Sequence, residues 1–210
     1  QAGGLNLPTA WDTATGSGVV VAVLDTGYRP HVDLNANILP GYDMISNVSV
    51  ANDGGGRDSD ARDPGDAISA NECGYTHGAQ NSSWHGTHVA GTVAAVTNNG
   101  EGVAGVAYNS KVVPVRVLGK CGGLTSDIAD GIIWASGGSV SGVPANANPA
   151  DVINMSLGGS GSCSSTTQSA INQARNNGTV IVIAAGNDND NSANYNPGNC
   201  NGVVNVASVG

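Results

Sequence analysis

The stretch Val19-Val20-Val21-Ala22-Val23-Leu24 leads directly into Asp25-Thr26-Gly27. An uninterrupted apolar run of this length is typical of a β-strand that is buried on both faces. Burying a carboxylate at the end of such a strand is costly unless the carboxylate finds partners. Asp25 is therefore either the cap of an ordinary turn or a functional group at a strand end.

Apolar runs and helical patterns alternate along the rest of the chain. The further expected strands are Val112–Leu118, Val152–Leu157, Thr179–Ala184 and Val203–Val209, all read as fully buried. The expected helices are His85–Val96, Asp127–Ser136 and Thr166–Asn177. This order predicts an α/β fold with a mostly parallel central sheet, helices on both faces and functional groups at the carboxyl ends of the strands. We expect residues 1–210 to form a single domain, with one long loop region at Asn47–Ser83.

Composition excludes several classes of partner. The chain has 40% apolar and 11% charged residues, and its net charge of −9 includes only seven Lys and Arg. Nucleic-acid binding requires clustered positive charge, so we expect no nucleic-acid partner. No apolar run has the length of a membrane span, so we expect no membrane partner. The polar start of the sequence predicts a mature chain whose leader has been removed.

The four cysteines, Cys73, Cys121, Cys163 and Cys200, contain no C-x-x-C pair, which argues against a zinc site. Their even number and their position in polar, turn-rich loops favour disulfides over free thiols. Sequence does not choose among the three possible pairings. Cys73–Cys121 and Cys163–Cys200 are the pairs that we expect.

Three further polar or glycine-rich motifs lie at the ends of expected helices or strands. His85-Gly86-Thr87-His88-Val89-Ala90-Gly91 opens an expected helix, but its two histidines are three apart and lack the glutamate of a zinc protease motif. His85 can face a cleft at the helix entrance, and we expect His88 to be a hydrogen-bonded core residue. Ser156-Leu157-Gly158-Gly159 and Ala184-Ala185-Gly186-Asn187 each end an expected strand.

These four motifs, in this order and spacing, resemble those of the subtilisin family of serine proteases along nearly the whole chain. The resemblance implies a subtilisin-like fold, incomplete at its C-terminus. It also implies that Asp25 orients His85, that His85 is the general base and then the general acid, and that Asn187 donates a hydrogen bond to the oxyanion.

The resemblance also implies a cleft for an extended peptide. Ser156, Leu157 and Gly158 would pair with one side of the peptide, and Gly122, Gly123 and Leu124 would flank the other. Ala184 and Gly186 would line the first specificity pocket. The Asn196–Pro197 bond would be cis, as in relatives.

The family places its nucleophilic serine in a Gly-Thr-Ser-Met-Ala type motif, which does not occur in these 210 residues. Three explanations stay open: a fragment of a longer protease, one piece of a nicked protein whose second chain carries the rest, or an inactive relative that binds peptides. A nucleotide-binding Rossmann fold would also have such a sheet, but this sequence lacks the Gly-x-Gly-x-x-Gly motif that such a fold carries after its first strand. The expected function is a secreted serine endopeptidase acting on proteins or peptides, and its own removed propeptide is a further expected partner.

Two calcium sites are expected. Asp58, Asp60, Asp63 and Asp66 put four carboxylates in nine residues, and such crowding is relieved by a cation with hard oxygen ligands. A solvated acidic loop is the alternative. Family resemblance implies a second site at Asp33, with Asn98 or Asn99 as partners, although Asn98-Asn99-Gly100 also has the sequence of a simple turn.

Overall fold

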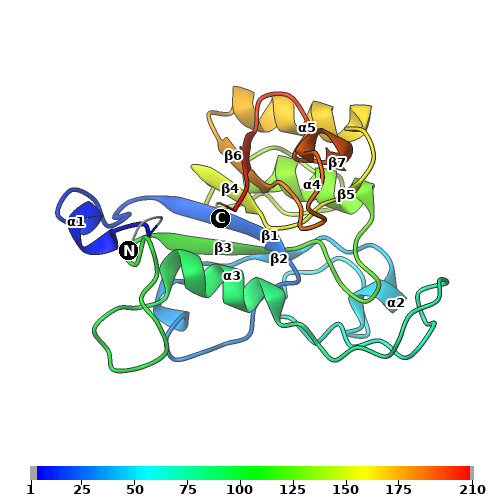
Figure 1. Cartoon of the computed structure of the whole chain (residues 1–210), viewed down its shortest axis with the longest axis horizontal. Helices are drawn as coiled ribbons and strands as arrows, with labels where there is room; N and C mark the ends of the chain where they lie inside the picture. The colour runs from blue at the N-terminus through cyan, green and yellow to red at the C-terminus, as the bar shows by residue number, and fades with distance from the viewer. Residues whose placement is uncertain (1–3, 209–210) are drawn as a thin grey trace.

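A central six-stranded sheet organises the computed structural model, which describes residues 4–208 (Figure 1). The strand order is β2-β3-β1-β4-β6-β8, and every pairing is parallel. The strands are β1 (Val20–Asp25), β2 (Tyr42–Asp43), β3 (Lys111–Arg116), β4 (Val152–Met155), β6 (Val180–Ala184) and β8 (Val204–Val206). A separate antiparallel pair joins β5 (Gly159–Ser160) to β7 (Tyr195–Asn196). The prediction of a mostly parallel sheet is confirmed.

Five α-helices and two short 3₁₀ helices connect these strands in the described residues. The helices are α1 (Leu7–Trp11), α2 (Val48–Ala51), α3 (His85–Ala94), α4 (Thr125–Ala135) and α5 (Ser165–Asn176), with 3₁₀ turns at Asn35–Asn37 and Ser192–Asn194. The Ser164 side chain caps α5 by accepting a hydrogen bond from the Thr167 N–H. α5 ends just before Gly178, whose φ of 92° suits a helix stop.

Helices cover both faces of the sheet, as predicted (Figure 1). Side chains alternate along β1, so Ala22 and Leu24 pack in the core under α4 and α5, whereas Val21 and Val23 pack against α3. Both packing layers are almost free of solvent. Truncating a fully buried residue such as Leu24 to alanine would cost about 2–5 kcal/mol of folding stability. This packing fixes β1, and with it the position of Asp25.

Three expectations are corrected by the structure. Thr179–Ala184 was expected to be fully buried, but Val180, the first residue of β6, is 49% exposed. Val203–Val209 was expected to form a buried strand, but β8 covers only Val204–Val206 and all three residues are exposed; Val209 lies outside the described residues. β8 is the edge strand of the sheet and, among the described strands, pairs with β6 alone. His88 was expected in the core, but it is exposed because it lies on the outer face of α3.

Both predicted disulfides are confirmed, with Cys73 bonded to Cys121 and Cys163 bonded to Cys200. The first ties the long loop before α3 to the segment between β3 and α4. The second ties the segment just before α5 to the segment before β8. Within residues 4–208, no helix combines the length and apolar character needed to cross a membrane.

Candidate active site

Asp25 is the last residue of β1 and is fully buried. Its Oδ1 accepts a hydrogen bond from the Thr26 N–H at 2.7 Å. Nδ1 of His85 lies 2.8 Å from Oδ1 and 2.9 Å from Oδ2 of the same carboxylate. The carboxylate that the sequence placed at a strand end therefore has the imidazole as its partner.

His85 is the first residue of α3, and its side chain is 47% exposed. Trp84, immediately before it, is the N-cap residue of α3 and has a left-handed backbone with φ of 51°. The hydrogen bond to Asp25 raises the pKa of the His85 imidazole above its ordinary value. His85 thus has one ring nitrogen on a buried carboxylate and the rest of its ring open to a cleft.

The turn after Asp25, at Thr26 and Gly27, is in direct contact with the start of α3. A Cβ on Gly86 would overlap the carbonyl oxygen of Gly27, so only glycine allows this approach. The Gly86 N–H donates to Oγ1 of Thr26 at 3.0 Å. This contact brings together two motifs that are 60 residues apart in the sequence.

A hollow of about 560 Å³ opens beside His85. Gly122 and Gly123 line one part of it, and Ser156–Gly159 line another. Leu124, also predicted to flank the peptide, is exposed and lies between the lining residues Gly123 and Thr125. The two segments predicted to hold an extended peptide therefore border one hollow together with His85.

Sequence reasoning missed a third wall of this hollow. Ile68, Tyr75 and Gln80 also line it, and they come from the long loop before α3. The signal that could have identified this wall is Cys73, whose disulfide to Cys121 places the loop next to Gly122. Tyr75 is 61% exposed, so its ring is accessible at the cleft.

A second hollow, of about 500 Å³, shares the Ser156–Gly159 segment with the first. Ala184, Gly186 and Asn187 line it, as do Asp188 and Tyr195. Ala184 ends β6, and Gly186 and Asn187 follow it, so the end of β6 places all three predicted residues beside Ser156–Gly159. The predicted cis bond at Asn196–Pro197 is present, and both residues line the first hollow.

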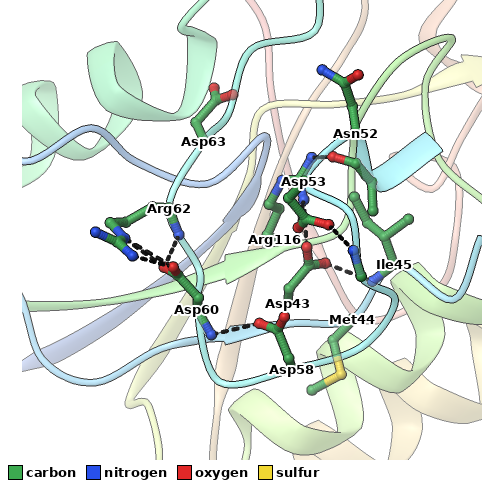
Figure 2. Close-up of polar contacts among 12 residues, drawn as sticks. Asp43, Met44, Ile45, Asn52, Asp53, Asp58, Asp60, Arg62, Asp63 and Arg116 are labelled. Carbon is green, nitrogen blue, oxygen red and sulfur yellow. Dashed lines mark hydrogen bonds and ion pairs between the residues drawn. The ribbon is translucent and has the colours of Figure 1, made fainter. Parts of the chain in front are cut away.

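Three of the four aspartates predicted as a calcium loop lie together. Asp58, Asp60 and Asp63 line one hollow of about 520 Å³ together with Asp53. Figure 2 draws the side chains of these four aspartates. Asp60 is paired with Arg62. The fourth, Asp66, instead lines the hollow of about 560 Å³ beside His85 and accepts hydrogen bonds from Ser83.

The acidic loop rests on a buried arginine, which sequence reasoning also missed. Arg116, at the end of β3, is 1% exposed and forms ion pairs with Asp43 and Asp53 (Figure 2). Its guanidinium also donates to the carbonyl oxygens of Ala51 and, at 3.2 Å, Thr26. Arg116 therefore connects the acidic loop to the turn that follows Asp25.

The other predicted calcium ligands lie at Asp33, on the α3 side of the sheet. The Asp33 carboxylate accepts hydrogen bonds from Nδ2 of Asn99 at 2.7 Å and from the Val103 N–H at 2.9 Å. The Val103 bond is the main reason that the pKa of Asp33 is lowered. Asn98 is exposed with φ of 60°, as in a turn. Among residues 4–208, no three His, Cys, Asp or Glu side chains are grouped as a ready metal site.

A buried aspartate bonded to Nδ1 of a histidine, at the carboxyl edge of a parallel sheet, is the arrangement of acid and base found in Asp-His-Ser hydrolases. Residues 16–210 match the family model described as "Peptidase S8: Subtilase family". The chain belongs to the subtilase family.

Curated relatives match nearly the whole chain. An "Extracellular protease" of Xanthomonas campestris pv. campestris is 68% identical over 98% of the chain and 36% of its own length. An "Extracellular basic protease" of Dichelobacter nodosus is 54% identical over 98% of the chain and 35% of its own length. The chain thus spans about a third of the length of these relatives.

Solved structures agree with the fold. A protease structure from Pseudoalteromonas arctica has a TM-score of 0.98 and 93% identity, and covers 100% of the chain and 62% of its own. A cold-adapted subtilisin-like serine proteinase has a TM-score of 0.65 and 31% identity, over 94% of the chain and 57% of its own. The subtilisin-like fold class is confirmed.

Proposed function

We propose that residues 1–210 are the larger part of the peptidase domain of a secreted serine endopeptidase that cleaves peptide bonds in proteins. The observation that most supports this proposal is the 2.8 Å contact between the fully buried Asp25 carboxylate and Nδ1 of the half-exposed His85. Relatives named as extracellular proteases support secretion.

The chemistry follows from the orientation of His85. With Nδ1–H donated to Asp25, the other ring nitrogen is an acceptor and can take the proton of a serine hydroxyl. Asp25 then stabilises the imidazolium, which returns the proton to the leaving amine. Asn187 donates its side-chain N–H to the oxyanion, and Ser156–Gly158 hold the peptide by main-chain hydrogen bonds.

The nucleophile of this proposal is a serine outside the present sequence. Within residues 4–208, the His85 ring makes its hydrogen bonds to Asp25. Ser156 lines both hollows, but its hydroxyl accepts a bond from the Asn154 amide, and the family pattern gives it a substrate-binding position.

The test is fluorophosphonate labelling of the full-length protein, followed by intact-mass measurement and peptide mapping. One adduct on a serine outside residues 1–210, together with turnover that His85→Ala lowers by at least about 10⁴-fold while the circular dichroism spectrum is kept, supports the proposal. A full-length protein that binds peptides without labelling or turnover would instead be an inactive, peptide-binding relative.

Calcium belongs to the same proposal, and the acidic loop fits it better than Asp33 does. Asp58 and Asp60 are exposed carboxylates that share one hollow with Asp53, so hard oxygen ligands are present on a loop open to solvent. The side chains of these three residues are not grouped as a ready metal site, so they would have to turn toward the ion, which would then relieve the repulsion among them. Asp33 is a weaker fit because it is only 4% exposed and both of its oxygens accept hydrogen bonds. Both oxygens of Asp60 accept hydrogen bonds too, but from the exposed Arg62, and such a surface pair is worth little and can give way to an ion.

A further inference from the structure

The Thr26 hydroxyl lies between the two catalytic motifs and is 5% exposed as a residue. It accepts a hydrogen bond from the Gly86 N–H at 3.0 Å and donates one to Oδ2 of Asp63 at 2.7 Å. Thr26 follows Asp25, and Gly86 follows His85. A single hydroxyl therefore links the segment that carries the carboxylate to the segment that carries the imidazole.

Asp63 is held rigidly behind this hydroxyl. It is 2% exposed, and its second oxygen, Oδ1, accepts from the Gly65 N–H at 2.8 Å. Figure 2 shows its side chain pointing away from the Asp60–Arg62 pair, although all three residues belong to the acidic loop. A carboxylate with no proton can only accept, so it fixes the direction in which the Thr26 hydroxyl donates.

The backbone around Asp63 is also joined to the catalytic turn. The Asp63 N–H donates to the Tyr28 carbonyl at 2.8 Å, and the Tyr28 N–H donates to the Ala61 carbonyl at 3.2 Å. A Cβ on Gly27, whose φ is 97°, would lie 2.5 Å from the Ala61 carbonyl oxygen, too close for any side chain. Three segments that are distant in sequence thus touch at one point beneath Asp25 and His85.

We propose that Asp63 and Thr26 are positioning residues of the catalytic pair. The two hydrogen bonds that join Asp63 to Thr26 and Thr26 to Gly86 set how Asp25 and His85 face each other. This inference rests on the proposed peptidase function and extends it to two residues that take no part in the proton transfer itself. Its magnitude follows from geometry, since a misplacement of about 1 Å between catalytic groups can cost on the order of 10²-fold in rate.

The experiment compares Thr26→Val, Thr26→Ser and Asp63→Asn in the full-length protein. Valine matches the shape of threonine but removes the hydroxyl, so we expect kcat to fall by about 10- to 100-fold with little change in KM. Serine keeps the hydroxyl and should restore most of kcat. Asp63→Asn loses one acceptor of two, so kcat should fall, but less than in Thr26→Val. All values are taken per active site, counted by fluorophosphonate labelling carried to completion.

Asp151→Asn is the matched control, because Oδ2 of Asp151 accepts a hydrogen bond from the Val20 N–H at the opposite end of β1. It should leave kcat unchanged, whatever it does to the melting temperature. Should Thr26→Val fail to fold, Asp63→Asn carries the test alone. A folded variant with wild-type kcat, or a serine variant as slow as the valine variant, would overturn the positioning role. A wild-type protein that neither labels nor turns over substrate would reject the peptidase function itself.

Discussion

The carboxylate of Asp25 spans Nδ1 of His85 almost symmetrically, with Oδ1 at 2.8 Å and Oδ2 at 2.9 Å. Asp25 has no exposed surface, whereas the His85 side chain is 47% exposed. The pair is thus anchored on its buried side and open on the side where a substrate can bind. This asymmetry suits a general base that must meet a proton donor from outside the sheet.

The first prediction concerns pH. His85, the proposed general base, can accept a proton only when it is neutral, so kcat/KM should rise with pH through the His85 pKa. The Asp25 hydrogen bond raises that pKa, which moves the acidic limb of the profile above the ordinary value of about 6.5. Asp25→Asn should shift the limb to lower pH and lower kcat by on the order of 10⁴-fold, because the amide favours the wrong tautomer.

The same pair affects folding with a definite sign. Because the folded-state pKa of His85 is raised, its contribution to stability is fully present below the unfolded pKa. It is lost as pH rises through the folded pKa. The difference in melting temperature between wild type and Asp25→Asn, measured from pH 5 to pH 9, should show this loss. In the kinetic experiment, an acidic limb of the kcat/KM profile that stays at the same pH in Asp25→Asn would contradict the role assigned to the pair.

The second prediction concerns Asn187, which lines the hollow that shares Ser156–Gly159 with the His85 hollow. Asn187→Ala should lower kcat by on the order of 10²–10³-fold with KM nearly unchanged, the cost known for the oxyanion asparagine of subtilisin itself. Steady-state kinetics on a peptide substrate provide the measurement. Asn176→Ala, an exposed asparagine at the end of α5, is the control, and equal kcat in both variants would remove Asn187 from the oxyanion site.

The third prediction concerns calcium. A site adds about 2.7 kcal/mol to the free energy of unfolding when the free calcium concentration is about 100 times its dissociation constant. For a chain of this size, chelation should then lower the melting temperature by about 5–10 °C. The double substitution Asp58→Asn/Asp60→Asn should abolish most of this response, whereas Asp12→Asn, an exposed aspartate beyond α1, should keep it. A melting temperature that chelator leaves unchanged in wild type would reject the site.

The fourth prediction concerns the buried ion pair of Arg116 with Asp43. Arg116→Met leaves the Asp43 carboxylate buried without its cation, so the free energy of unfolding should fall by about 3–5 kcal/mol. Urea denaturation gives the value. Arg62→Met removes an exposed partner of Asp60 and should have a much smaller effect. Adding Asp43→Leu to Arg116→Met should recover part of the loss; no recovery would mean that Arg116 stabilises mainly through Thr26 and Ala51.

Local pattern decided much of the fold and the site. The run before Asp25 became β1, and the helix expected from His85 became α3, shortened by two residues to Ala94. Apolar periodicity carries this information because burial of one stripe is the main stabilising force of each element. The family motifs then pointed to Asp25, His85 and Asn187, and both disulfide pairs agree with expectation.

Only the tertiary structure decided which polar groups are partners. Asp66 was grouped with Asp58 and Asp60 by proximity in sequence, yet it lines the hollow beside His85. Arg116 looked like one more strand residue, although it joins Asp43 to the turn after Asp25. Spacing along a chain fixes the phase of a helix or strand, but ion pairs and hydrogen bonds form between segments whose separation is set by packing. That physical difference is why the Asp63–Thr26–Gly86 link is invisible in the sequence and plain in the fold.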